Sequence, residues 1–150
     1  MEIKKIVFAT DFSESSVNAL RYAVDLAKQY GARLYFLHVL YDVAKTSGWY
    51  VPHVSMDEMY KDMEKSAREE LDKLFVDEMR GYEGIERIVL KGTPHEEIVT
   101  YAEEQNIDMI VIGTHGRKGI DRMIFGSTAE QVIRNAPCPV LSVRLPRHLK

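Results

Sequence analysis

The chain has 150 residues, of which 45% are hydrophobic and 29% are charged, so it can form one globular domain with a substantial core. Its formal net charge of -3 argues against nucleic-acid binding as the main activity, and no apolar run is long enough to cross a bilayer. The single cysteine, Cys138, excludes a disulfide within the chain and suits a reducing compartment, so we expect a cytoplasmic protein.

The first third of the sequence predicts a strand, a helix and a second strand. Apolar runs that do not alternate with polar residues are typical of buried parallel strands, and they occur at Ile3–Ala9 and Leu34–Leu40. Between them, Ser13 is a suitable N-cap and Gly31 a suitable helix end. The apolar face of this helix is expected to contain Val17, Leu20, Val24 and Ala27.

The middle of the sequence begins with residues 41–55, which show no clear period and form a long connection of the kind that is usually functional or mobile. A capping box of Ser55 and Glu58 predicts the start of a long helix. The expected apolar stripe of that helix is Met56, Tyr60, Met63, Ala67, Leu71 and Leu74. A strand at Ile85–Leu90 follows, and then a helix that starts at the capping box of Thr93 and Glu96 and runs to about Asn106.

The last third predicts a strand at Met109–Ile112, a glycine-containing loop, a helix and a strand at Pro139–Val143. Ser127 is expected to cap the helix, with Glu130 completing a capping box. The helix face is expected to contain Ala129, Val132, Ile133 and Ala136. Strands thus alternate with helices along residues 1–150, which predicts a single α/β domain: an open parallel sheet with helices on both faces.

The loop has the features of a phosphate-binding loop. Gly113 and Gly116 stand at the strand end and Gly126 stands before the helix, so an anion could approach the backbone N–H groups and the helix N-terminus. Arg117, Lys118 and Arg122 bring positive charge to this loop. The alternative is a loop that only closes over the sheet edge, and neither of the two standard glycine motifs for nucleotides is present.

The spacing Gly113-x2-Gly116-x9-Gly126-Ser127 is similar to the signature of the ATP-binding branch of the universal stress protein family. The chain resembles that family over essentially its whole length. Two further segments carry the resemblance, namely Ala9-Thr10-Asp11 and the closing run Cys138–Val143. The resemblance implies a Rossmann-like five-stranded sheet in the order 3-2-1-4-5, in which the ends of the first and fourth strands form the switch point where ligands bind.

The resemblance also implies ATP, with Mg²⁺ or Mn²⁺, as the ligand. Ala9 and Val39 would flank the base, and Asp11 would accept hydrogen bonds from the base or ribose or help to hold the metal ion, unless it only favours the start of the first helix. His115 is expected to contact the base edge or to be a bystander. The implied contacts are Ala9, Thr10, Asp11, Val39, Gly113, Thr114, His115, Gly116, Arg117, Gly126, Ser127 and Thr128. No catalytic residue and no metal-ligand cluster is predicted, and the sequence does not decide whether His38 faces the crevice or a helix layer.

Three functions are compatible with these features. The first is a homodimeric, ATP-dependent stress-response or regulatory module that pairs through the edge strand Val140–Val143 and acts on an unknown protein partner. The second is a slow ATP hydrolase or an enzyme that phosphorylates itself on Ser13, Ser15 or Ser16. The third is an interaction protein that binds no nucleotide. We expect no nucleic-acid and no membrane partner.

Overall fold

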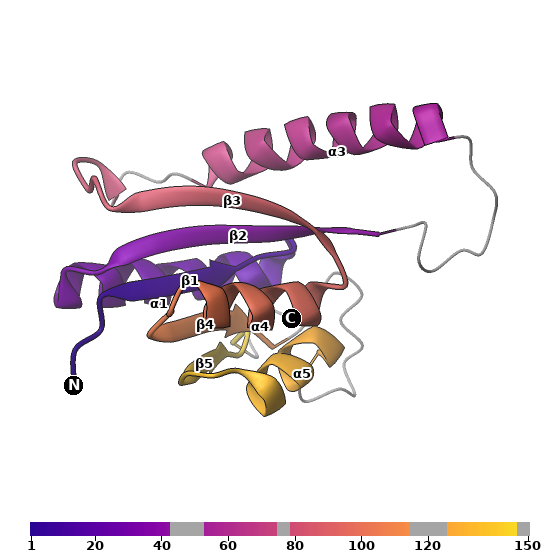
Figure 1. Ribbon diagram of the computed structural model, residues 1–150. Helices are drawn as coiled ribbons and strands as arrows, with labels where there is room; N and C mark the ends of the chain where they lie inside the picture. Colours follow the sequence, from indigo (N-terminus) through magenta and orange to yellow (C-terminus); the bar gives the residue numbers. More distant parts are fainter. Residues whose placement is uncertain (43–52, 75–78, 115–125, 147–150) are drawn as a thin grey trace.

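The computed structural model describes residues 1–42, 53–74, 79–114 and 126–146. For residues 53–55 it describes the backbone alone. Five parallel strands form one sheet in the order β3-β2-β1-β4-β5, which confirms the predicted architecture (Figure 1). The elements in chain order are β1 Lys5–Ala9, α1 Glu14–Tyr30, β2 Arg33–Tyr41, α3 His53–Lys73, β3 Ile85–Gly92, α4 Pro94–Glu104, β4 Met109–Gly113, α5 Ser127–Asn135 and β5 Val140–Val143.

Two apolar clusters, one on each face of the sheet, form the core. One face packs against α1 and α3, through strand residues such as Phe8, Phe36 and Val111. The other face packs against α4 and α5, through strand residues such as Val7 and Ile112. Because side chains alternate between the faces along a strand, the position of each residue near a strand end determines which helix layer it meets.

The helix starts differ from the predictions in three places. Ser13 does cap α1 and accepts a hydrogen bond from the backbone N–H of Ser16, as predicted. The prediction for Ser127 is wrong, because Gly126 is the N-cap of α5 and Ser127 is its first helical residue. Thr93 is the N-cap of α4, but its side chain makes no capping hydrogen bond. Ser55 lies inside α3, which begins at His53, so the capping box predicted there is wrong.

The buried face of α1 differs from the predicted one, because one predicted residue is exposed and other residues are buried in addition. Val17 is 39% exposed, whereas Ala19 and Ala23 are fully buried beside the predicted Leu20 and Val24. Alanine allows a helix axis to approach a sheet closely, so the small residues and not the branched Val17 face the strands. Ile133 of α5 is likewise 42% exposed, and Leu74 lies beyond the end of α3.

Some element bounds also differ from the expected ones. β1 begins at Lys5 and not at Ile3, although Ile3 is buried. β3 continues to Gly92, and α4 ends at Glu104 and not near Asn106. Strand ends depend on the neighbouring strand that is available for pairing, and β2 provides partners for β3 as far as Gly92.

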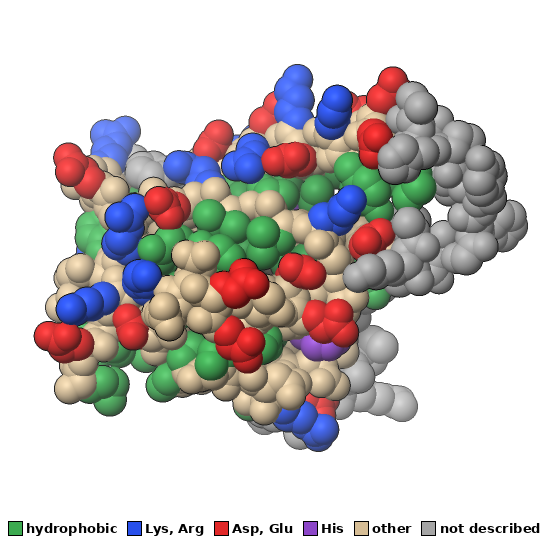
Figure 2. Space-filling view, in the orientation of Figure 1, with side chains coloured by type: hydrophobic (Ala, Val, Ile, Leu, Met, Phe, Trp, Pro, Cys, Tyr) green, Lys and Arg blue, Asp and Glu red, His purple; other side chains and the backbone are tan. Residues whose placement is uncertain are grey.

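The face of the molecule shown in Figure 2 carries charged side chains over α3 and apolar side chains in the band between α3 and α4, where β3 and β2 run in Figure 1. Ile88 and Leu90 of β3 are half-buried members of the α4/α5-side cluster in that part of the molecule. None of the helices in the described ranges is both long and apolar enough to pass through a membrane.

Candidate functional site

The carboxyl ends of β1 and β4 form the switch point of the sheet. The two strands are neighbours, with Ala9 paired to Ile112. The chain leaves β1 toward α1 on one face, whereas it leaves β4 toward α5 on the other. In open α/β sheets, ligands bind in the crevice outside such a pair of strand ends, so the geometry selects this end of the sheet.

The two described flanks of the glycine loop meet at this place. The carbonyl oxygen of Thr114 accepts a hydrogen bond from the backbone N–H of Gly126, which places the start of α5 beside the end of β4. The N–H of Thr114 donates to the carbonyl of Val143 at 3.1 Å, so the end of β5 is held there as well. The predicted contacts His115, Gly116 and Arg117 lie outside the described residues.

Two of the predicted contacts lie on the same face as α5. Ala9 is almost fully buried and Val39 is half-buried, and both belong to the cluster on the α4/α5 side. Thr114 follows the last residue of β4, and its backbone carbonyl accepts a hydrogen bond from Gly126 at the start of α5. The predicted base-flanking residues and the first turn of α5 thus lie on one side of the sheet.

The start of α5 provides hydrogen-bond donors. The first N–H groups of a helix have no acceptor within the helix, and the positive end of the helix dipole lies there. Ser127 is exposed and Thr128 is half-buried in this first turn. The arrangement suits an anionic group that approaches from the end of β4.

Thr114 has an unusual side chain. It is fully buried, and its Oγ1 atom has no hydrogen-bond partner in the described part of the chain. Burying a hydroxyl without a partner costs about 1–3 kcal/mol, so such groups are rare unless something else satisfies them. Sequence reasoning included Thr114 among the contacts only because it lies inside the motif.

Thr10 builds the turn that follows β1. Its N–H donates to the carbonyl of Leu37 at 2.9 Å, and its hydroxyl lies 2.8 Å from the hydroxyl of Ser16. The same hydroxyl oxygen accepts from the N–H of Phe12 at 2.9 Å. The polar atoms of Thr10 therefore have partners inside the chain, and its contact with a ligand stays a prediction.

Asp11 begins the next turn. Its Oδ1 atom accepts from the N–H of Ser13 at 2.9 Å, so the carboxylate shapes the start of α1. The side chain is half-buried at the switch point. The helix-start role of Asp11 is thus observed, and its role toward a ligand stays a prediction.

His38 lies on the α1/α3 side, which answers the question that the sequence left open. Its Nδ1 atom is 2.8 Å from the carbonyl oxygen of Thr10. Its ring stacks against Phe12 with centroids 4.4 Å apart and an interplanar angle of 33°. Phe12 has a left-handed backbone, with φ of 65°. No sequence signal indicates this, because bulky residues rarely adopt positive φ.

The serines that the self-phosphorylation alternative requires are poorly accessible. Ser15 and Ser16 are each only 4% exposed, and Ser13 is half-buried and caps α1.

In the ranges that the structure describes, no group of three or more potential ligands could hold a metal ion. Burial and then the charge of Asp108 raise the pKa of the Cys138 thiol, which makes it a weak nucleophile.

Comparison with known proteins places these features in context. The sequence profile of the Universal stress protein family matches residues 2–144. A universal stress protein of Methanocaldococcus jannaschii, MJ0531, is 38% identical over 146 residues, which are 96% of this chain and 84% of that protein. The solved structure of MJ0577, reported as a structure-based assignment of biochemical function, superposes with a TM-score of 0.86 at 27% identity and covers 98% of this chain and 99% of the other.

Two further solved structures contain nucleotides. A universal stress protein in complex with cAMP has a TM-score of 0.66 at 25% identity, with coverage of 96% of this chain and 98% of the other. A universal stress protein from Archaeoglobus fulgidus in complex with dAMP has a TM-score of 0.58 at 25% identity, with coverage of 95% and 99%.

Proposed function

Because the chain belongs to the universal stress protein family, we propose that it is an ATP-binding regulatory module of the stress response that acts as a homodimer. The nucleotide would lie across the ends of β1 and β4, with its base between Ala9 and Val39 and its phosphates toward α5. Complexes of related proteins with cAMP and dAMP support a ligand of this chemical class.

One observation carries the proposal most directly: the buried Thr114 hydroxyl has no partner in the described chain, and it belongs to the residue whose backbone carbonyl accepts from Gly126 at the N-terminus of α5. A phosphate oxygen would accept from such a hydroxyl and from first-turn N–H groups of the helix. The apolar side chains of Ala9 and Val39 on the same face would suit an adenine ring.

The expected metal ion fits this arrangement as part of the nucleotide complex. Magnesium is usually held by one or two carboxylates together with phosphate oxygens and water. Asp11, which follows the end of β1, would contribute such a carboxylate. The ion would partly neutralise the phosphate charge.

Isothermal titration calorimetry with ATP and Mg²⁺ tests the proposal. We expect about one ATP bound per chain and weaker binding by at least about tenfold in Val39→Phe, because the larger ring would occupy the space of the base. The matched control is Val89→Phe, which changes a half-buried valine on the neighbouring strand but on the opposite face. Binding by this control should stay within about threefold of wild type.

Either of two results would overturn the nucleotide site. Wild-type protein that binds no ATP, and releases no adenine nucleotide when denatured after purification, would favour the interaction protein without nucleotide. If Val39→Phe and Val89→Phe weakened ATP binding equally, the nucleotide would bind elsewhere or both variants would have lost their fold.

The dimer is the second part of the proposal. Among the described residues, β5 pairs with β4 alone and forms an edge of the sheet, and Val140 and Leu141 are half-buried there. An uncovered apolar edge favours pairing with a second copy. Analytical ultracentrifugation should show a dimer for wild type and for Tyr30→Lys, which changes an exposed residue of α1, and a monomer for Val140→Lys. A monomeric wild type would contradict the proposed dimer and leave the proposed nucleotide site unaffected.

A further inference from the structure

The turn after β1 is held from the neighbouring strand by His38. The His38 Nδ1 atom lies 2.8 Å from the carbonyl oxygen of Thr10, and its ring stacks on Phe12. Within this turn, Phe12 has a φ of 65°. A bulky residue with positive φ costs free energy, so contacts that hold it in place are needed.

The partner atom fixes the form of the imidazole. A carbonyl oxygen can only accept a hydrogen bond, so the Nδ1 atom of His38 must carry the proton and donate. In the neutral side chain this selects the tautomer with hydrogen on Nδ1.

The backbone turn after β1 also determines where the Asp11 carboxylate lies at the candidate site. Thr10 and Phe12 flank Asp11, whose Oδ1 accepts from Ser13 at 2.9 Å. A shift of the Thr10 carbonyl would change the backbone direction at Asp11 and therefore the position of its carboxylate at the end of β1.

We propose that His38 is a positioning residue for the nucleotide site: its Nδ1–H holds the Thr10 carbonyl, and its ring supports Phe12, so that the Asp11 carboxylate is presented to the nucleotide and its metal ion. The part that concerns the ligand rests on the proposed function. The part that concerns the turn does not.

Three substitutions separate the two contacts of His38. His38→Asn keeps an N–H donor at the place of Nδ1 but loses the ring. His38→Phe keeps the ring against Phe12 but loses the donor. His38→Gln moves the donor to the place of Nε2 and is the matched control for an amide at this position.

Calorimetry with two probes gives the readout. We expect ATP affinity to fall by about tenfold in His38→Phe and His38→Gln, and to stay within about threefold of wild type in His38→Asn. Tripolyphosphate added without a divalent ion has no base, ribose or metal for Asp11 to contact, so it should bind all variants within about twofold of wild type. If His38 served only the general stability of the fold, its substitution would weaken the binding of ATP and of tripolyphosphate alike. That result would overturn the proposal.

The tautomer is measured without any ligand. Two-bond nitrogen–proton NMR spectra of the imidazole should show hydrogen on Nδ1 of His38, and amide shifts of Asp11 and Ser13 should move more in His38→Phe than in His38→Asn. Hydrogen on Nε2 alone would refute the inference whatever ATP does. Wild type that shows the Nδ1 tautomer but binds no ATP would instead refute the proposed function, together with the ligand part of the inference, and leave the turn role standing.

Discussion

A Cβ atom at Gly113 would lie only 2.8 Å from the backbone carbonyl oxygen of Ser15, a distance that real Cβ atoms essentially never show. The first turn of α1 therefore packs directly on the end of β4. The absence of a side chain at Gly113 thus makes room for this helix, and the contact of Gly113 with a ligand stays a prediction. The end of β4 is therefore in close contact with α1 at Gly113, next to its pairing with the end of β1 at Ile112.

Gly113→Ala should lower the free energy of unfolding by about 1–3 kcal/mol, because α1 must move away from β4 to admit the methyl group. Urea unfolding of the protein without nucleotide measures this loss. The control is Gly84→Ala, where the nearest atom to the added Cβ is a ring carbon of Tyr82 at 3.3 Å. A loss in Gly113→Ala no greater than in Gly84→Ala would contradict the close packing.

Much of the fold follows from the sequence because apolar runs and helical spacing report burial directly. The buried runs of β1, β2 and β4 lie where non-alternating apolar residues indicated strands. The strand order came from the resemblance alone, because strand periodicity does not encode which strands pair.

Details that depend on tertiary contacts could not be predicted. Ser127 has the right residue type for a cap, yet Gly126 takes that position because its N–H donates to Thr114 and keeps its backbone extended outside the helix. At the candidate site, the side on which Ala9 and Val39 lie follows from strand alternation once the helix layers are known. The engagement of Thr10 with Ser16 requires the three-dimensional turn.

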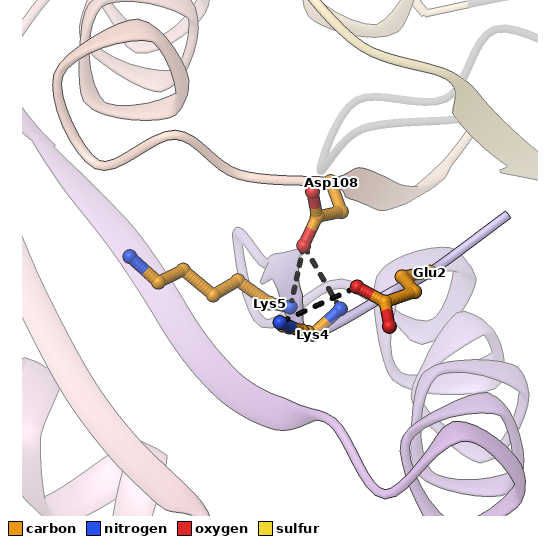
Figure 3. Close-up of polar contacts among 4 residues, drawn as sticks. All are labelled: Glu2, Lys4, Lys5 and Asp108. Atoms are coloured by element: carbon orange, nitrogen blue, oxygen red, sulfur yellow. Dashed lines mark hydrogen bonds and ion pairs between the residues drawn. The ribbon is translucent and has the colours of Figure 1, made fainter.

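Asp108 ties the amino ends of β1 and β4 together. Its Oδ2 atom accepts hydrogen bonds from the N–H groups of Lys4 at 2.9 Å and Lys5 at 3.0 Å (Figure 3). Asp108→Ala should lower the free energy of unfolding by about 1–3 kcal/mol, because two strand N–H groups lose a charged acceptor. Asp108→Asn should lose less, since one amide oxygen remains.

Glu2→Gln is the control for this change. It removes the charge of the Glu2–Lys4 ion pair, a contact of 3.3 Å between side chains that are 81% and 75% exposed (Figure 3). Exposed pairs contribute little, so the free energy of unfolding should change by less than about 0.5 kcal/mol. Comparable losses in Glu2→Gln and Asp108→Ala would show that the charge near the N-terminus matters and the two backbone hydrogen bonds do not.

Tyr101 is expected to make the free energy of unfolding depend on pH in the alkaline range. Burial, followed by the effects of Tyr35 and Glu86, raises the pKa of the Tyr101 hydroxyl from 10.0 to about 12. Between these values the unfolded chain loses a proton that the folded chain retains, so the free energy of unfolding should fall as pH rises through this window. In Tyr101→Phe, which keeps the ring against Tyr35, this fall should be smaller.

Urea unfolding at about pH 9 and about pH 11 measures the effect, with Tyr22→Phe as the control because Tyr22 is 41% exposed. A spectroscopic titration of tyrosinate provides a second measurement, in which Tyr101→Phe should lose the component with the highest pKa. An unchanged titration curve in Tyr101→Phe would show that the hydroxyl of Tyr101 ionises like the exposed tyrosines.

Thr114 and Thr10 offer a matched pair of buried hydroxyls at the candidate site. Both side chains are buried, but the hydroxyl of Thr10 has hydrogen-bond partners whereas that of Thr114 has none among the described residues. Valine replaces a hydroxyl with a methyl group at nearly equal volume. Without nucleotide, Thr10→Val should lower the free energy of unfolding by about 1–3 kcal/mol, and Thr114→Val should leave it unchanged or raise it by up to about 1 kcal/mol.

Adding ATP with Mg²⁺ should make wild type more stable than Thr114→Val, which is the opposite of the order expected without nucleotide. A ligand that binds only the folded state stabilises it in proportion to its affinity, so wild type should gain in melting temperature. Thr114→Val should gain less, because the phosphates lose a buried donor. If Thr114→Val instead destabilised the free protein as much as Thr10→Val does, its hydroxyl would have a partner within the chain, and the strongest structural support for a phosphate site would be lost.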